Sequence, residues 1–402
     1  MRSLRGVAGR WLLGGLALAL AGCGGAAPSG VTIEPIPSST GQTAPAATVL
    51  APGAATTTAP GFPTLAFAAI TERPVPADLA AELQSILDDL AGDAGLSATV
   101  MSARGTWSGA TGKADAVRAM TIEDQFAIAS TTKALVAAQV MVLVEAGELR
   151  LDDPAADHLP SDLHFDTNGA TIRQLLGQRS GIPNYLPTVD PQLIADPLRL
   201  WTPAELLAAV PAERTPAGAH FDYGNTNYVL LGLVIEEVRG RPLAEVLRKG
   251  ILGIDGVDRL ILQPDEIPTV PMAMPNGQST DALETGGGFL PSLALTSDGP
   301  AASMASDSPS LARWWRAFCA GEVVSQASLT QMATMQDGYG LGLYQPDPPG
   351  TVGHGGEHIG YTSLAGCLPR DGIVVVVLAN RSADVIDVSA IAGPLVDRLR
   401  AP

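Results

Sequence analysis

The fold and the chemistry of this chain are both indicated by one stretch, Phe126-Ala-Ile-Ala-Ser-Thr-Thr-Lys133. Its first four residues form a short apolar run, which predicts a strand or an extended segment over 126–129. Residues 131–145 then follow the apolar pattern of a long helix. Ser130 and Lys133 are three residues apart at the start of this helix, so their side chains share one helix face and the lysine can reach the serine hydroxyl.

A serine followed by a lysine at this spacing has two interpretations. A serine hydroxyl becomes a strong nucleophile only when a nearby base takes its proton, and Lys133 can act as that base if its surroundings depress its pKa. The first turn of a helix also directs backbone N–H groups toward developing negative charge. The alternative is a capping serine followed by a solvated lysine. The chain contains only three lysines, which reduces the chance of the pairing by coincidence.

The segments around this stretch predict a sheet interrupted by a helix-rich insertion. Upstream, residues 77–91 have helical spacing, and 97–103 and 105–111 are typical of strands. Helices and loops dominate from 145 to about 290. The downstream pattern predicts a strand-rich end and a closing helix. The predicted helices of the insertion are 204–210, 228–238 and 243–248, the later strands are 338–344, 361–368 and 372–379, and the closing helix is 385–399.

Two further motifs carry side chains that suit chemistry on a carbonyl group. Tyr223-Gly224-Asn225 stands directly before an apolar helix, where a tyrosine can relay a proton and an amide can hold a lysine and a substrate carbonyl together. His354-Gly355-Gly356 offers glycines that let a substrate approach the backbone closely. Each motif alone also fits an ordinary turn.

Together, in this order and spacing, the three motifs resemble the serine β-lactamase and D,D-peptidase superfamily, in its class C β-lactamase-like and esterase-like branch. Leu175-Leu-Gly-Gln-Arg-Ser-Gly-Ile-Pro183 and Gly353-His-Gly-Gly-Glu-His-Ile-Gly-Tyr361 resemble the same branch. The resemblance covers about residues 77–400. It implies an α/β fold in which helices flank an antiparallel sheet and an all-helical lobe is inserted.

The resemblance also implies roles for individual residues. Ser130 would be the acylated nucleophile, and Lys133 and Tyr223 would handle the proton. Asn225, His354 and Gly356 would bind the substrate, and the backbone N–H groups of Ser130 and Glu357 would form the oxyanion hole. The implied activity is that of a serine hydrolase acting on an ester, a D-amino peptide or a β-lactam, including D-alanyl-D-alanine carboxypeptidase chemistry. No cofactor or metal is implied.

The chain departs from the superfamily at His354, where a lysine is expected. If His354 clamps a substrate carboxylate, it must be protonated, and binding of acidic substrates falls above the ordinary histidine pKa of about 6.5. If instead neutral His354 supports the Tyr223 hydroxyl, neutral and acidic substrates respond alike. The second model is favoured, because arginine, which this chain uses freely, would make the better clamp.

Three other functions bear on the same sequence. His354-Gly-Gly-Glu357-His358 matches the inverted zinc-protease pattern, but that chemistry needs both histidines on one helix, and the glycines oppose a helix there. Gly-x-Ser-x-Gly, the motif of the nucleophile elbow in α/β-hydrolases, is absent from the sequence, which argues against that fold. A non-catalytic peptidoglycan- or penicillin-binding protein on the same scaffold is the alternative to an enzyme.

The first 76 residues predict an export signal and a tether. Arginines precede an apolar run over 11–21, and Leu20-Ala-Gly-Cys23 is similar to a bacterial lipobox, in which the cysteine is lipidated. We therefore expect a signal peptide over 1–22, a lipidated Cys23 with an Ala/Pro/Thr-rich tether over 23–76, and the hydrolase domain over 77–402. The protein would be anchored to the cell membrane on its extracytoplasmic face.

The composition and charge of the chain limit the classes of molecule that it is expected to bind. The formal charge is −17, and no Lys/Arg tract occurs, which argues against a nucleic-acid partner. The expected partners are a small-molecule or peptidoglycan-derived substrate, and the membrane through the lipid anchor. Cys319 and Cys367 can pair outside the cytoplasm, although two buried unpaired thiols are favoured.

Overall fold

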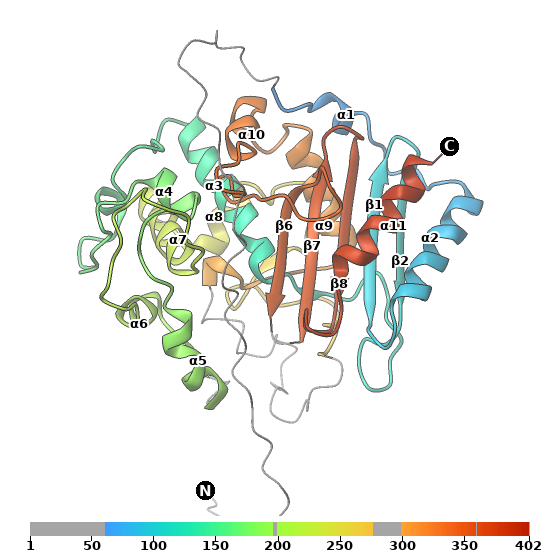
Figure 1. Cartoon of the computed structure of the whole chain (residues 1–402), viewed down its shortest axis with the longest axis horizontal. Coiled ribbons are helices and arrows are strands. Elements are labelled where there is room, and N and C mark those ends of the chain that lie inside the picture. The colour runs from blue at the N-terminus through green and yellow to red at the C-terminus, as the bar shows by residue number, and fades with distance from the viewer. Residues whose placement is uncertain (1–60, 196–198, 276–298, 359, 402) are drawn as a thin grey trace, which may run out of the picture. The chain divides into compact units, whose positions relative to one another are not determined.

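The computed structural model describes residues 61–195, 199–275, 299–358 and 360–401. Cys23 and most of the predicted tether lie outside these residues. The described chain forms a mixed α/β domain in which a sheet stands beside a helical region (Figure 1). This arrangement confirms the predicted α/β class with an antiparallel sheet, flanking helices and a helical insertion.

The main sheet has five strands in the order β2-β1-β8-β7-β6, and every neighbouring pair is antiparallel. The sheet brings the two ends of the domain together, because β1 pairs with β8 across almost the whole chain. It places β6, which contains His354, at one edge. The strands are β1 (Leu96–Ser102), β2 (Gly105–Thr111), β6 (Val352–His358), β7 (Tyr361–Leu368) and β8 (Ile373–Ala379).

Helices cover both faces of this sheet. Successive side chains of a strand point to opposite faces, and in β8 the valines at 375 and 377 pack on one side while those at 374 and 376 pack on the other. α2 (Ala77–Leu90) and α11 (Val388–Arg400) cover the first face, with Leu79, Leu83 and Leu87 buried. α9 (Ser308–Cys319) covers the second face and contacts α1 (Leu65–Ala68). β1, β7 and β8 are consequently buried throughout.

The helical region is built around α3 (Thr132–Glu145), which packs against α7 (Thr226–Arg239). Nearly every residue of α3 is buried, as expected for a helix that is apolar all round. In Figure 1 α3 lies between the sheet and the helices labelled α4 to α7. The remaining helices of the domain are η2 (Ala155–His158), α4 (Ile172–Leu176), α5 (Leu186–Ala195), α6 (Pro203–Ala208), α8 (Leu243–Lys249) and α10 (Gln326–Met332).

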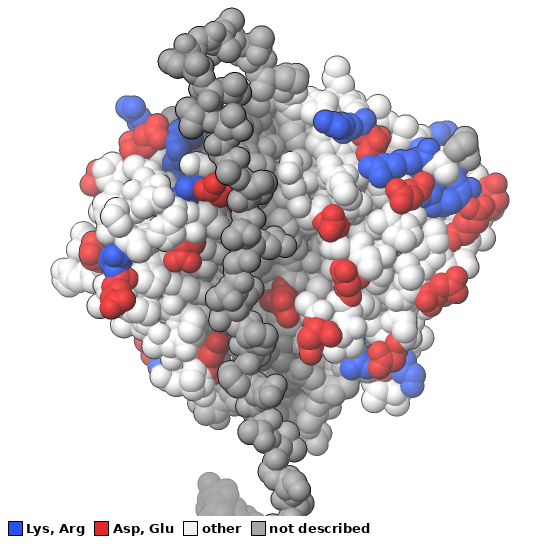
Figure 2. Space-filling view, in the orientation of Figure 1, with Lys and Arg blue, Asp and Glu red and all other residues white. Residues whose placement is uncertain are grey.

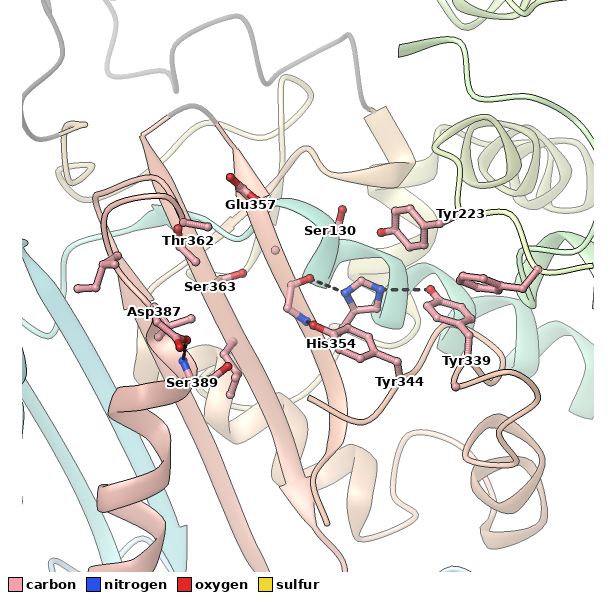
Figure 3. A pocket seen from close by; sticks show the side chains of 18 of the residues that line it. Ser130, Tyr223, Tyr339, Tyr344, His354, Glu357, Thr362, Ser363, Asp387 and Ser389 are labelled. Atoms are coloured by element: carbon pink, nitrogen blue, oxygen red, sulfur yellow. Dashed lines mark hydrogen bonds between the residues drawn. The ribbon is translucent and has the colours of Figure 1, made fainter. Parts of the chain in front are cut away.

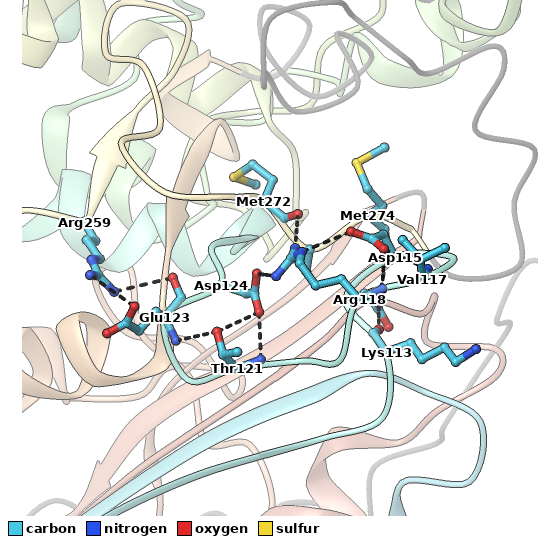
Figure 4. Close-up of polar contacts among 12 residues, drawn as sticks. Lys113, Asp115, Val117, Arg118, Thr121, Glu123, Asp124, Arg259, Met272 and Met274 are labelled. Carbon is cyan, nitrogen blue, oxygen red and sulfur yellow. Dashed lines mark hydrogen bonds and ion pairs between the residues drawn. The ribbon is translucent and has the colours of Figure 1, made fainter.

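A second, three-stranded sheet in the order β3-β5-β4 delivers the chain to α3. It consists of β3 (Phe126–Ala127), β4 (Ile261–Leu262) and β5 (Met304–Ser306). The loop before β3 is fixed by Arg118, whose guanidinium bridges Asp115 at 3.1 Å and buried Asp124 at 2.5 Å (Figure 4). Asp124 also accepts from the Thr121 backbone N–H at 2.7 Å. This network therefore positions the segment that leads to Ser130.

One strand expected from the sequence does not form. Residues 338–344 are a looped turn and not a strand, because Gly338 and Gly342 adopt φ values of +84° and +75° that interrupt an extended strand. Conversely, residues 352–358 form a strand despite three glycines. On a strand the histidines at 354 and 358 are about 13 Å apart along the chain, so the helical geometry of the zinc-protease pattern does not form.

The packed domain begins before residue 77. Phe62 and Phe67 are buried in the core, and the Phe62 backbone N–H donates to Thr330 Oγ1 at 3.0 Å. Residues 61–76, which we predicted as the end of the tether, therefore belong to the folded unit. The two aromatic side chains supply the apolar contact that the surrounding Ala, Pro and Thr residues lack.

Cys319 and Cys367 form a disulfide, which corrects the favoured expectation of two unpaired thiols. The bond joins the end of α9 to β7, so it links a covering helix to the sheet. The cysteines are 48 positions apart in the sequence, so the contact could not be predicted locally; the packing of α9 on the sheet brings them together.

Candidate active site

Ser130 lies in a short 3-10 helix, η1 (Ala129–Thr131), between β3 and α3. The residue before it, Ala129, has a φ of +46°, a left-handed conformation that costs a non-glycine residue about 1–3 kcal/mol. Such backbone strain persists only where surrounding contacts enforce it. Ser130 lines a cavity of about 730 Å³ between η1, the edge of β6 and the loop before α7. The strained turn thus presents the serine to an open cavity.

Lys133 lies one helical turn after Ser130 and is fully buried. Its Nζ donates to Ser130 Oγ at 3.0 Å, to Asn225 Oδ1 at 2.8 Å and to the Ala301 carbonyl at 3.0 Å. Ala301 belongs to η5 (Gly299–Ala301). An ammonium group has three N–H donors, and a buried charge is tolerated only when it is paired or hydrogen-bonded. These acceptors therefore suit the protonated form of Lys133 in the resting enzyme.

Tyr223 lines the same cavity as Ser130, and Figure 3 shows its ring beside the serine. Its ring centroid lies 4.9 Å from Lys133 Nζ, within the range of a cation–π contact. The side chain is partly exposed, at 38%, so the phenol is accessible from the cavity. The structure thus places Ser130, Lys133, Tyr223 and Asn225 together.

Two side chains that carried no assigned role hold the Tyr223 loop in place. Gln178 Oε1 accepts from the Gly224 backbone N–H at 3.1 Å, and Asn184 Oδ1 accepts from the Asn225 backbone N–H at 3.2 Å. Gln178 belongs to the 175–183 segment that had shown only a resemblance. The sequence motif that contains Gln178 was recognised, but its distance along the chain gave no reason to place Gln178 beside residues 223–225.

His354 is buried and lies on β6. Its Nδ1–H donates to the Gly355 carbonyl at 2.5 Å, and its Nε2 accepts from the Tyr339 hydroxyl at 3.1 Å. These roles are those of the neutral imidazole, the form that the lowered pKa of His354 favours. Burial, with a smaller contribution from the Lys133 charge, lowers the pKa of His354 to about 3. A carboxylate clamp by a protonated histidine is thereby disfavoured.

The hydroxyl that His354 supports is that of Tyr339 and not, as we expected, that of Tyr223. Both nitrogens of the imidazole are already engaged, and the Tyr223 ring lies 6.3 Å away between centroids. The Tyr344 ring packs edge-on at 5.0 Å from the imidazole. Tyr339 and Tyr344 were missed as site residues because their segment was predicted as a strand.

Glu357 and Gly356 lie where β6 passes η1. A Cβ atom on Gly356 would come within 2.2 Å of the Ile128 carbonyl oxygen and 2.9 Å of the Ser130 nitrogen, so only glycine fits there. The backbone groups of Gly353 and Gly355 bond outward, to the Tyr344 backbone and hydroxyl. Backbone groups two residues apart on a strand point to the same edge. The Glu357 N–H therefore also points out of the edge of β6, beside Ser130.

Residues 80–391 match the model of the family described as Beta-lactamase. The chain belongs to the beta-lactamase family. Membership in this family, together with the contact between Ser130 and buried Lys133, supports an acyl-serine hydrolase.

Solved structures show the same fold. The chain superposes on the D-stereospecific amidohydrolase from Streptomyces sp. with a TM-score of 0.61 and 26% identity, over 79% of this chain and 97% of that one. For the D-amino acid amidase from Ochrobactrum anthropi SV3 complexed with L-phenylalanine amide the TM-score is 0.67 at 23% identity, over 81% of this chain and 100% of that one. At 23% identity, the similarity to the D-amino acid amidase supports a shared fold only.

Curated relatives match over shorter stretches. The putative penicillin-binding protein PbpX of Bacillus subtilis (strain 168) is 26% identical over 267 residues, which are 63% of this chain and 62% of PbpX. Protein flp of Staphylococcus aureus is 35% identical over 120 residues, 28% of this chain. The alignment spans only about a quarter of Protein flp, 23% of its length.

Within this beta-lactamase-family site, the described cavity wall is acidic and aromatic. Three carboxylates line it, those of Asp337, Glu357 and Asp387, and no lysine or arginine is among its described lining residues. Four aromatic rings complete the wall, those of Phe221, Tyr223, Tyr339 and Tyr344.

Proposed function

We propose that this protein is a lipid-anchored, extracytoplasmic serine hydrolase that forms an acyl-serine intermediate on an ester, a D-amino peptide or amide, or a β-lactam. The observation that carries the proposal is the 3.0 Å contact between Lys133 Nζ and Ser130 Oγ at the floor of an open cavity.

Acylation begins when Ser130 Oγ attacks the substrate carbonyl carbon. The hydroxyl proton passes to the Tyr223 oxygen, which accepts it in the phenolate form beside the Lys133 ammonium, and an oxyanion forms on the former carbonyl oxygen. The N–H groups of Ser130 and Glu357 stabilise that oxyanion. When the tetrahedral intermediate collapses, the bond to the leaving group breaks and the leaving group takes up the proton, which leaves the acyl chain on Ser130.

Deacylation repeats these steps with water as the nucleophile. Tyr223, again as the phenolate, removes a proton from water, the hydroxyl adds to the acyl carbon, and Ser130 Oγ leaves with that proton returned to it from Tyr223. Lys133 contributes mainly by holding Ser130 Oγ and Asn225 in place, since its acceptors suit the ammonium form. Tyr223 is therefore the favoured proton carrier.

Amides and esters of D-amino acids are the favoured substrates within these classes. The Streptomyces neighbour is named for a D-stereospecific amidohydrolase activity. The acidic cavity and the neutral His354 offer a substrate carboxylate little attraction, which makes a carboxylate-bearing β-lactam the least favoured of the three. The similarity to PbpX keeps a slow penicillin-binding function as the second candidate.

Two observations support the proposed location on the extracytoplasmic face of the membrane: the N-terminal sequence around Cys23 and the Cys319–Cys367 disulfide. Leu20-Ala-Gly-Cys23 after an apolar run supports lipidation of Cys23. The Cys319–Cys367 disulfide suits an oxidising compartment outside the cytoplasm. Among the described helices, none combines the length and apolar character that a membrane span requires.

The proposal is tested by intact-protein mass spectrometry after incubation with a fluorescent penicillin or with an activated neutral ester of a D-amino acid. We expect one acyl adduct, mapped to Ser130, that decays as product is released. Ser130→Ala should abolish both labelling and turnover. Ser389→Ala, which changes a second serine of the same cavity, should retain both.

Persisting turnover in Ser130→Ala would exclude the acyl-serine mechanism. A penicillin adduct that never decays, with no turnover of the ester, would favour the penicillin-binding candidate.

A further inference from the structure

Tyr344 occupies backbone groups at the outer edge of β6 that a substrate chain would otherwise use. Its backbone N–H donates to the Gly353 carbonyl at 2.9 Å, and its carbonyl accepts from the Gly353 N–H at 3.0 Å. Its hydroxyl oxygen accepts from the Gly355 N–H at 3.0 Å. The Gly355 carbonyl in turn accepts from His354 Nδ1 at 2.5 Å. The two outward-facing residues that precede Glu357 on β6 are thus already hydrogen-bonded within the protein.

The Tyr344 side chain is held in this position by its neighbours. Its ring packs edge-on against His354 with 5.0 Å between centroids, and it stacks on the Tyr339 ring at 6.5 Å with 12° between the planes. A Cβ atom at residue 355 would come within 2.5 Å of the Tyr344 hydroxyl oxygen, so glycine at this position lets the hydroxyl reach the strand. In Figure 3 the imidazole of His354 lies between Ser130 and Tyr344. The closed part of the edge therefore belongs to the wall of the cavity that holds the serine.

Glu357 is the next outward-facing residue of β6. Within the described ranges, no turn, loop or helix hydrogen-bonds to its backbone. Its N–H is the one that we assign to the oxyanion hole, so the scissile carbonyl of a bound substrate lies opposite it. β6 therefore offers a substrate an open residue at 357, whereas the edge toward the start of the strand is closed.

An extended substrate would bind as an added strand at this edge, which is how peptides bind to open sheet edges. Every neighbouring pair of the main sheet is antiparallel. A substrate chain antiparallel to β6, with its scissile carbonyl opposite Glu357, directs its leaving-group side toward Gly355. Because alternate residues of a strand face the same edge, the second residue after the scissile bond would lie opposite Gly355. The carbonyl of that residue would need the Gly355 N–H, which the Tyr344 hydroxyl occupies.

We propose that Tyr344 is a specificity-determining residue that closes the edge of β6 to the leaving-group side of the substrate. A second backbone residue in the leaving group then contributes no hydrogen bond to β6, and it has to pass the Tyr344 ring. The inference rests on the proposed acyl-serine function and adds a limit on the leaving group of that reaction.

The test compares kcat/KM in the full-length protein for two esters of N-acetyl-D-alanine that differ by one residue in the leaving group. The shorter ester releases glycolamide, and the longer one releases glycolyl-glycinamide, so the same type of alcohol leaves in both. The second residue of the longer leaving group supplies the carbonyl that would face Gly355. Both esters are uncharged, because Figure 2 shows acidic side chains in the middle of the right-hand half of the face, where the sheet lies, and a charge on one ester alone would add its own attraction or repulsion.

For the native protein we expect the longer ester to be no better a substrate than the shorter one. Tyr344→Ala removes the ring and the hydroxyl and exposes the Gly355 N–H. It should raise the ratio of kcat/KM for the longer to the shorter ester about fivefold, the effect of one added hydrogen bond. Tyr344→Leu keeps an apolar side chain against His354 but is too short to reach Gly355, so it should raise the ratio as well, and it serves as the test if the alanine variant does not fold. Tyr344→Phe is the matched control, because it keeps the ring over the edge and should keep the native ratio.

The ratio cancels any change in turnover that is common to both esters. An unchanged ratio in the alanine and leucine variants, with Ser130 still labelled, would overturn the inference. A native preference for the longer ester that disappears in Tyr344→Phe would also overturn it, because the hydroxyl would then bind the leaving group and not exclude it. Failure of the proposed function is distinct from both outcomes, because neither ester would then be turned over and Ser130 would not be labelled.

Discussion

His354 provides a quantitative test of the site, because its protonation state in the folded protein is opposite to the one expected of an exposed histidine in mild acid. In the folded protein the imidazole is buried, and both of its nitrogens are hydrogen-bonded. Burial lowers its pKa from the usual 6.5 to about 3. In the unfolded chain the same side chain is protonated below pH 6.5.

The sign of the effect follows from which state binds the proton. Between pH 6.5 and pH 3 the unfolded chain binds a proton at His354 that the folded protein does not, so acid stabilises the unfolded state. The stability contribution is fully present above pH 6.5 and is lost as pH falls below it. At pH 4.5, two units below the unfolded value, the loss is about 2.7 kcal/mol at ~1.36 kcal/mol per unit. This value does not depend on the exact folded pKa, provided that it lies well below 4.5.

The assay is urea unfolding of the native protein and of His354→Gln at pH 7.5 and pH 4.5. Other acid-sensitive groups are common to both proteins and cancel in the difference. The stability advantage of the native protein over the variant should therefore shrink by about 2.7 kcal/mol between the two pH values.

A second readout is the imidazole NMR signal that disappears in the variant. That signal should not titrate between pH 5 and pH 8. A midpoint near 6.5, or a stability difference that does not change with pH, would refute the conclusion that His354 is held neutral.

Three further outcomes are expected. Tyr223→Phe should lower kcat by about 10² to 10⁴ with an unchanged circular dichroism spectrum, because the ring packing stays and only the proton carrier is lost; near-native turnover would leave Tyr223 a structural role. Replacing Cys319 and Cys367 together by alanine should lower the free energy of unfolding by ~4 kcal/mol in urea titrations, from the entropy of a 48-residue loop, and a loss below 1 kcal/mol would contradict that reasoning. Cys23→Ala should abolish labelling with a radioactive fatty acid, and continued labelling would exclude that cysteine.

Much of the fold was predictable because its elements have strong local patterns. The helical spacing over 77–91 corresponds to α2, the run over 131–145 to α3, and the β-branched run over 372–379 to β8. Each of these patterns is a direct consequence of burial on a helix face or between two covering layers. The Ser130–Lys133 contact was likewise predictable, since three residues along a helix is a fixed geometry.

The rest of the site depends on contacts that no local pattern contains. β6 has too many glycines to be recognised as a strand, yet Gly356 is required because the strand passes within contact of Ile128 and Ser130. The segment over 338–344 also contains three glycines, but they alternate with Tyr339, Leu341 and Leu343 at the period of a strand; the segment instead serves as a turn that brings Tyr339 to His354. The position of Gly356 depends on the register of β6 against β7, where it lies opposite Ser363, and register is a property of the assembled sheet.

The neutral state of His354 and the buried charge of Lys133 belong to one electrostatic arrangement. The Lys133 charge adds to burial in lowering the pKa of His354, and the Tyr223 ring packs against both groups, 4.9 Å from Lys133 Nζ and 6.3 Å from the imidazole. His354 contributes no change of charge to the site across the neutral pH range, because its pKa of about 3 lies well below that range. The acid limb of any pH–rate profile between pH 5 and pH 8 must therefore come from a group other than His354. Conversely, replacing Lys133 by a neutral residue removes one of the two causes of the lowered pKa and should raise the pKa of His354 from its low value, while burial alone keeps it below 6.5.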